Sequence, residues 1–404
     1  MIYLNTRMAS TLFAFGIFFT LSCAQLGLTS SDEEQVYTST EYEQQLEQVS
    51  EELTRNPGDA ELEKKKAEIL ASIAANTSVP DQRNAIYANL RELGDTQILR
   101  DGESQPEIDN LIRTAWTNEQ SEGVRLLQQE QDDMSDHTFG TVISHFENAI
   151  TLNPDSLNTY SLLANTYYRH GDFNDAIHTL ERSLERSQAA KPQIREKLAY
   201  LYLESGDIES SIELYTSLVD ENPGDAHIRH GLANAHILDM NHAKAIEILR
   251  PLTEQYNTRY EYHEALASQL YFRFAEQAGT ILQENESPSD EDAQLLIMML
   301  EEADSIFETL SGVLPFHEEQ KLRTATFYKN SAAMLNRLST FADGEIREGF
   351  YAMHQDFLDK ALPAWEALAE NHPENIDYIR ALIDVYSELG MDDDAESLKR
   401  SYNL

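Results

Sequence analysis

The sequence has a single cysteine, Cys23, and few cations, and both shortages exclude classes of structure and partner. With one thiol, the chain cannot form an intrachain disulfide. Lysine and arginine together number 30 against 71 aspartates and glutamates, which gives a formal net charge of −41 at pH 7. Affinity for nucleic acid comes from cations that neutralise phosphates, so no nucleic-acid partner is expected, and an anionic membrane surface is disfavoured for the same reason. The charge favours solubility, as in a salty habitat, or else a charge-guided partner site.

Long apolar runs are also missing, apart from one near the start. Residues 8–21 form a run of about 14 residues, shorter than the roughly 20 that span a bilayer, but suited to the core of a signal peptide. The run ends in the sequence TLSCA at residues 20–24, which resembles the lipobox of bacterial lipoproteins. The resemblance implies that Cys23 carries lipid and, because Ala24 rather than aspartate follows it, that the outer membrane is favoured. The alternative is ordinary signal cleavage after Ala24, which releases a soluble periplasmic protein.

Motifs that would indicate an enzyme are missing as well. The sequence has no nucleotide-binding loop, nucleophile elbow, HExxH motif or dinucleotide fingerprint, so we expect no cofactor and no small-molecule substrate. His227 and His230 are three residues apart and could face one Zn²⁺, but no cysteine or ordered carboxylate completes such a set, so no metal site is predicted. An enzyme built in the aperiodic region 281–352 has little support in the sequence.

What the chain does contain is a repeated pattern. A leucine–alanine pair opens four similar segments, at residues 163–167, 198–202, 232–236 and 266–270, whose starts are 35, 34 and 34 residues apart. A period of about 34 residues is typical of helix–turn–helix arrays. The junction Asn-Pro-Gly-Asp occurs at residues 56–59 and again at 222–225, and related junctions begin at Asn153 and His372. These junctions, spread over the chain, predict that the repeat architecture extends toward both of its ends.

The spacing of the small and aromatic residues resembles the tetratricopeptide repeat (TPR). Residues 157–190 supply Tyr160, Leu163, Ala164, Tyr167, Gly171, Ala176 and Leu180, and residues 192–225 supply Leu198, Ala199, Tyr202, Gly206, Tyr215, Leu218 and Pro223. A final unit has Leu382, Tyr386, Gly390 and Ala395. The resemblance implies an all-α solenoid, wound as a right-handed superhelix, in which neighbouring helix pairs bury apolar faces that none of them could bury alone. Met240 departs from the pattern, because it stands where the third copy would have its turn glycine.

The pattern divides the chain into six segments. We expect a lipoprotein signal peptide at residues 1–22, a polar tether at 23–40, degenerate helical repeats at 41–140 and a central TPR array at 141–275. A divergent long-helix insertion at 276–355 and a C-terminal TPR-like unit at 356–404 follow. Within these segments we expect a polar connection at residues 95–106, separate helices at 108–116 and 124–130, and long helices at 295–310, 318–341 and 349–370. The fourth copy is expected to keep only its first helix.

The resemblance also implies a function, because the first helices of such repeats line a concave groove that holds peptides or partner helices. The family's groove positions fall on Asn165, Tyr168, Arg169, Tyr200, His227, His230 and Asn234. Ser161 and Glu196 stand where the family's carboxylate clamp needs cations. The sequence therefore predicts a non-enzymatic scaffold for a protein or peptide partner in the bacterial cell envelope. A self-assembling subunit of an envelope complex is the alternative.

Overall fold

The fold is entirely helical in the part of the chain that the structure describes. The structure, a computed structural model, describes residues 39–101, 105–129, 134–186, 192–284, 287–313 and 317–404. These residues form seventeen α-helices and one short 3₁₀-helix, with no β-strand among them. The lipidation site predicted at Cys23 and the predicted signal peptide lie outside the described residues. The all-α solenoid predicted from the repeat is confirmed.

The helices follow one another along the chain with short connections. In order, they are α1 Ser39–Arg55, α2 Ala60–Asn76, η1 Pro80–Arg83, α3 Asn84–Asp101, α4 Pro106–Gln129, α5 Asp136–Leu152, α6 Leu157–His170, α7 Phe173–Arg186, α8 Pro192–Ser205, α9 Ile208–Glu221, α10 Ala226–Leu238, α11 His242–Gln255, α12 Tyr260–Glu284, α13 Asp290–Val313, α14 Glu318–Phe341, α15 Gly344–Asn371, α16 Ile376–Glu388 and α17 Asp392–Tyr402.

The Asn-Pro-Gly-Asp junctions and the glycine turns lie where helices begin and end. In the two Asn-Pro-Gly-Asp junctions, Asp59 accepts hydrogen bonds from the first backbone N–H groups of α2, and Asp225 does the same for α10. These carboxylates satisfy donors that a helix start leaves unpaired. Gly171 ends α6 in the left-handed region at φ 92°, where a Cβ would be strained. Met240 lies at the equivalent turn after α10 with φ 56°.

Two expectations in the N-terminal third were wrong. The predicted polar connection at 95–106 is mostly helix, because α3 continues to Asp101. The two predicted helices at 108–116 and 124–130 are one helix, α4, which runs unbroken through polar residues. Gly123 lies inside that helix, at a position where a Cβ would come within 2.7 Å of Cε1 of Phe146 in α5. The glycine therefore permits two helices to pack closely and does not end either of them.

The long helices at the C-terminal end differ from the expectation in one respect. The predicted helix 318–341 is α14, and the predicted helices 295–310 and 349–370 lie within α13 and α15. The fourth copy, however, does not consist of a first helix alone, because α12 packs against the long helix α13. Helices of 25 and 24 residues have replaced the usual shorter pair, which is why the repeat period is lost there. The predicted segment limits at 275 and 355 fall inside α12 and α15.

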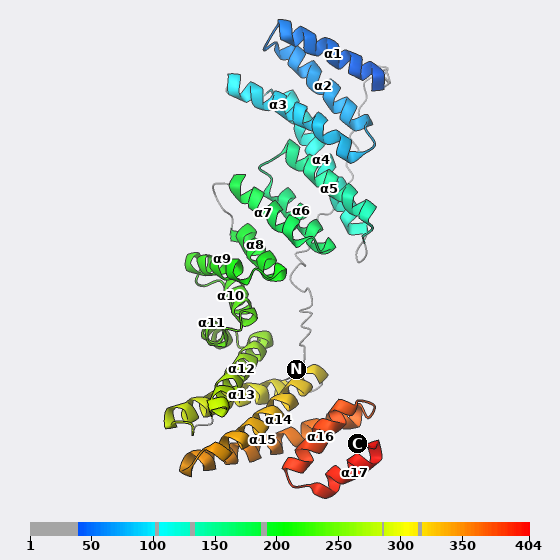
Figure 1. The fold of residues 1–404 in the computed structure, drawn as a ribbon. Helices are drawn as coiled ribbons and strands as arrows, with labels where there is room; N and C mark the ends of the chain where they lie inside the picture. The colour runs from blue at the N-terminus through cyan, green and yellow to red at the C-terminus, as the bar shows by residue number, and fades with distance from the viewer. Residues whose placement is uncertain (1–38, 102–104, 130–133, 187–191, 285–286, 314–316) are drawn as a thin grey trace.

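The helix pairs are stacked in an elongated, curved array that runs from α1 to α17 (Figure 1). Pairs such as α6 with α7 and α8 with α9 pack against their neighbours in sequence, and α3 is an additional helix that packs on α2 and α5. From α10 onward the buried side chains form one continuous core that reaches α17, whereas four smaller clusters hold the N-terminal half together.

Candidate functional site

Two tyrosines join the first helices of adjacent pairs. The hydroxyl groups of Tyr168 in α6 and Tyr200 in α8 are 3.0 Å apart, and their ring centroids are 5.9 Å apart in an edge-to-face arrangement. Both side chains are half-buried. Burial raises the pKa of Tyr200 well above its ordinary value, and hydrogen bonds with Tyr168 and Glu204 raise it further. The pair therefore presents flat apolar surface with neutral polar ends.

The other two predicted positions on α6 differ in their exposure and contacts. Asn165 is half-buried on the same helix, one turn before the tyrosine. Arg169 is exposed, and its Nη1 donates to the carbonyl oxygen of Leu127 at 3.1 Å, which ties α6 to α4. The guanidinium of Arg169 thus already has a partner within the fold.

On α10 the three predicted positions differ in their exposure. His227 is exposed, whereas His230 is half-buried with its ring centroid 4.9 Å from that of Tyr262. Burial lowers the pKa of His230, and the nearby His227 lowers it further, so the fold disfavours the charged imidazole. Asn234 is half-buried, and its Oδ1 atom is buried without a hydrogen-bond donor in the described structure. An acceptor in this state costs roughly 1–3 kcal/mol relative to a satisfied one.

The structure thus brings the two tyrosines into contact and leaves the two histidines as neighbours along one helix. Within the described residues, no group of three or more histidine, cysteine, aspartate or glutamate side chains is arranged to hold a metal ion. None of the described helices is both long enough and apolar enough to span a bilayer.

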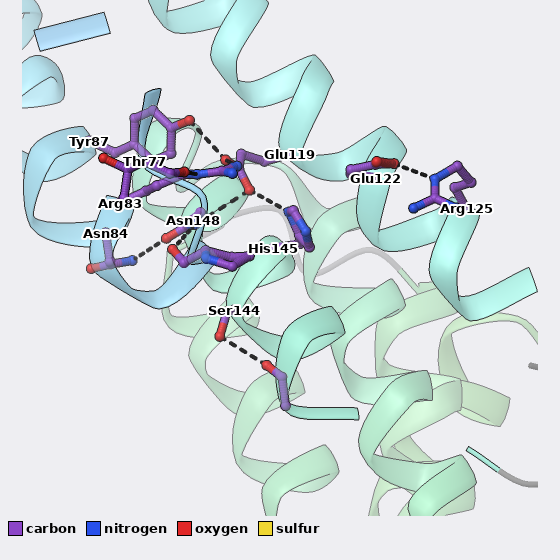
Figure 2. A network of polar contacts seen from close by, with 12 residues as sticks. Thr77, Arg83, Asn84, Tyr87, Glu119, Glu122, Arg125, Ser144, His145 and Asn148 are labelled. Atoms are coloured by element: carbon purple, nitrogen blue, oxygen red, sulfur yellow. Dashed lines mark hydrogen bonds and ion pairs between the residues drawn. The ribbon is translucent and has the colours of Figure 1, made fainter. Parts of the chain in front are cut away.

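The sequence analysis missed a buried polar network centred on Glu119 of α4 (Figure 2). Oε1 of Glu119 accepts hydrogen bonds from Nη1 of Arg83 and from the hydroxyl of Tyr87, both at 2.8 Å. Oε2 lies 2.6 Å from Nδ1 of His145 and accepts from Nδ2 of Asn148 at 3.4 Å. These partners come from η1, α3 and α5, so a single carboxylate connects four consecutive elements.

The electrostatics of the network favour an ionised carboxylate. The side chain of Glu119 is 2% exposed. Burial acts to raise its pKa, but hydrogen bonds from His145, Arg83 and Tyr87 outweigh burial, and the net pKa is lowered. The same contact raises the pKa of Tyr87, where burial is the larger cause and the Glu119 charge the second. Because both oxygens are occupied by donors of this chain, the network serves packing and leaves no lone pair directed at a substrate.

A signal for this site was present in the sequence. The buried residues of α4 include Ile108, Ile112, Glu119, Gly123 and Leu127, which follow the helical period of a single buried stripe. A single helix over residues 106–129 places Glu119 on that stripe, whereas two separate helices at 108–116 and 124–130 leave Glu119 in the connection between them.

An open hollow of about 340 Å³ lies between α14 and α15, within the region 281–352 that was considered for an enzyme site. It is lined by Asn336, Ser339, Thr340, Arg347, Glu348 and Tyr351. Nε of Arg347 donates to the carbonyl oxygen of Ser339 at 3.0 Å. The hollow therefore offers one committed cation and one carboxylate, and no convergent set of ionisable groups.

Comparison with known proteins identifies the repeats. Sequence models of the tetratricopeptide repeat match residues 161–226 and 202–270. No curated protein matches the chain. Similar solved structures include a tetratricopeptide repeat protein from Parabacteroides merdae, with 15% identity and a TM-score of 0.42 over 67% of this chain and 99% of that one. The MamA protein has 14% identity and a TM-score of 0.37 over 49% and 94%. YrrB, described as a TPR protein with an unusual peptide-binding site, has 13% identity and a TM-score of 0.33 over 52% and 91%.

Repeats of this class generally mediate protein–protein interactions, and proteins built from them are typically scaffolds without catalytic activity. The family matches lie on the helix pairs that carry Tyr168, Tyr200 and Asn234. The chain therefore contains tetratricopeptide repeats at residues 161–270 and has an all-α TPR fold.

Proposed function

We propose that this chain is an interaction scaffold of the bacterial cell envelope, anchored through lipid on Cys23, which binds a protein or peptide partner on the first helices of its central repeats. The binding surface consists of the exposed sides of α6, α8 and α10 around Tyr168 and Tyr200. The proposed anchor rests on the sequence of residues 8–24 alone, and the proposed binding surface rests on the geometry of the repeats.

The contact between Tyr168 and Tyr200 is the observation that carries the proposal. Two aromatic rings from successive repeats lie edge to face without being fully buried. Tyrosine in this state adds contact area at a low cost in side-chain entropy, and it is enriched where proteins meet. The buried acceptor of Asn234 supports the same surface, because a backbone N–H of a bound segment would satisfy it after a small side-chain movement.

Binding on this surface requires little ordering of the scaffold. The tyrosine hydroxyls already hold each other, and Arg169 is already held by Leu127. A surface ordered before binding loses little conformational entropy when a partner arrives.

Photo-crosslinking tests the proposed surface. A photoreactive phenylalanine analogue at His227, which is exposed on α10, is expected to crosslink to a partner in envelope membranes. The same analogue at Glu213, exposed on the second helix α9, should give no such product. Affinity for the identified partner is then measured for the double variant Tyr168→Ala with Tyr200→Ala, and for Tyr351→Ala, whose tyrosine is 54% exposed on α15. Equal affinity of wild type, the double variant and Tyr351→Ala for the partner would reject the proposed surface. A crosslink between two copies of the chain would favour the self-assembling alternative.

Metabolic labelling tests the proposed anchor separately. Cells that express the wild-type chain are grown with a clickable fatty acid, and the label is expected on the protein in the membrane fraction. The Cys23→Ser variant should be unlabelled. Labelling that persists in this variant, or a wild-type chain that never carries the label, would contradict the anchor but leave the binding surface untouched.

A further inference from the structure

A half-buried carboxylate on the proposed binding surface lacks a partner. Glu196 lies on α8, one turn before Tyr200, and makes no hydrogen bond or ion pair with any described residue. Burial is the largest influence on its carboxyl group and raises its pKa; among the weaker effects, His227 and Lys197 lower the pKa and Asp225 raises it. A partly desolvated carboxylate without a donor is in an unfavourable state that a cation from outside would relieve.

The same repeat position in another helix of this chain holds a cation. Glu196, His230 and Glu264 occupy equivalent positions in α8, α10 and α12, each 34 residues from the next. Oε1 of Glu264 lies 2.5 Å from Nη1 of Arg323, which comes from α14. At this repeat position the carboxylate of Glu264 therefore pairs with a guanidinium, that of Arg323, which comes from the next helix pair in the array.

The described residues around Glu196 supply no such cation. The titratable group of α10 that acts on Glu196 is His227, which lowers the pKa of the carboxyl but forms no ion pair with it in the described structure. Glu196 thus shares the repeat position and the half-burial of Glu264 but has no guanidinium paired with it, as Arg323 is paired with Glu264.

The side chains beside Glu196 suit a cation with an apolar stem. Tyr200 follows at a spacing of four residues and Glu204 at a spacing of eight, so the three lie along one side of α8. The hydroxyl of Tyr200 is 3.0 Å from that of Tyr168. An aromatic ring between two carboxylates can accommodate the stem of lysine or the plane of arginine while a carboxylate pairs with the charge.

We propose that Glu196, with Tyr200, binds a lysine or arginine side chain of an extended basic segment in the partner. The proposal rests on the proposed function, because it names the chemistry of the partner on the same surface. The formal net charge of −41 supports it, since a negative field attracts a basic segment before contact. In the family's carboxylate clamp, cations of the repeat bind a carboxylate of the partner. Here a carboxylate of the repeat, Glu196, would bind a cation of the partner, and it stands at one of the positions where the clamp needs a cation.

A matched pair of charge variants tests this inference. Fluorescence anisotropy measures the binding of a labelled peptide that carries three spaced arginines, and of the same peptide with citrulline in their place. We expect Glu196→Gln to weaken binding of the arginine peptide about tenfold, as expected for the loss of one charge-assisted hydrogen bond. Glu213→Gln removes the same charge from an exposed site on α9, and should change the affinity less than about twofold through the long-range field alone. The citrulline peptide should bind weakly to all three proteins.

The outcomes are distinct. Equal losses in the two variants would show a general attraction of basic peptides to an acidic surface and would overturn the role of Glu196, as would no loss in either variant. Circular dichroism should show that Glu196→Gln melts at or above the wild-type temperature, because the carboxylate has no partner within the fold and its burial disfavours the charge. If the crosslink at His227 forms while Glu196→Gln binds the basic peptide normally, the scaffold function survives and only the basic segment is refuted. If no crosslink forms at His227, the proposed scaffold function is refuted, and the inference about Glu196 that rests on it is refuted as well.

Discussion

The buried Glu119 network gives the most specific prediction about stability. Glu119→Gln keeps the shape of the side chain but removes its charge and gives it an amide donor that faces His145 and Asn148. Arg83 and His145 then remain in place, the latter with a side chain 6% exposed, without the carboxylate that they contact. Hydrogen bonds to charged groups contribute about 1.5–3 kcal/mol each, and breaking a buried pair typically costs about 3–5 kcal/mol. Because the amide oxygen can still accept from Arg83 and Tyr87, we expect a loss of about 3 kcal/mol.

Glu122→Gln provides the matched control. Glu122 lies three residues further along α4, its side chain is 45% exposed, and it pairs with Arg125 (Figure 2). Exposed pairs of this kind contribute little, so the control should lose less than about 0.5 kcal/mol.

The assay has to resolve local stability, because an array of repeats can unfold in pieces. Hydrogen exchange is therefore measured alongside urea denaturation. In Glu119→Gln we expect faster exchange in α3, α4 and α5 and unchanged exchange in α16, which lies in a separate core. Equal effects of the two substitutions, or an increase in stability of Glu119→Gln, would refute the reasoning.

Three further predictions concern pH, close packing and backbone strain. The fold lowers the pKa of Glu119, so the ionised carboxylate stabilises the protein at any pH above the pKa that this group has in the unfolded chain. This stabilisation is lost as the pH falls through the lower pKa of the folded state. In urea titrations, the stability advantage of wild type over Glu119→Gln should therefore shrink below about pH 4.5. Gly231→Ala places a Cβ 2.4 Å from Cε1 of Tyr215 and should lower the free energy of unfolding by about 1–3 kcal/mol. Gly140 has open space around it, so Gly140→Ala should stabilise its helix by about 0.5–1 kcal/mol. The opposite order of stability in melting experiments would contradict the packing. Met240→Gly relieves a positive φ of 56° and should raise stability by about 1 kcal/mol, and an unchanged or lower midpoint would mean that the turn is not strained.

Local patterns predicted much of the fold because their causes are local. The junctions at Asp59 and Asp225 cap helices through atoms two or three residues away, so sequence alone was enough to place them. The error in α4 arose from the same local reasoning, since a polar stretch that ends in Gly123 looks like a connection. Gly123 instead lies inside the helix and permits close packing against Phe146 on another helix, a contact that no local window includes.

The polar contacts of the two sites depend on neighbours distant in sequence, and these were harder to predict. Repeat spacing placed Tyr168 and Tyr200 on adjacent first helices, and their contact follows from that register. The environment of Glu119 could not be derived in this way, because Arg83 lies 36 residues before it and His145 lies 26 residues after it. The unpaired state of Glu196 likewise depends on what the next repeat supplies.

The restriction of helix contacts to neighbouring elements has a mechanical consequence. In the part of the chain that the structure describes, each helix packs mainly against the elements just before and after it, with further contacts one element beyond, such as α3 with α5 and α12 with α14. Within that part, no extensive packing between elements far apart in the chain fixes the curvature of the array. Small changes in the angle between successive helix pairs then add up along the array. The distance between its ends can therefore change while each local core remains intact. A force applied to one end of the array would be distributed over many slight rotations between helix pairs. The junctions among η1, α3, α4 and α5 would rotate least, because the Glu119 network connects these four elements.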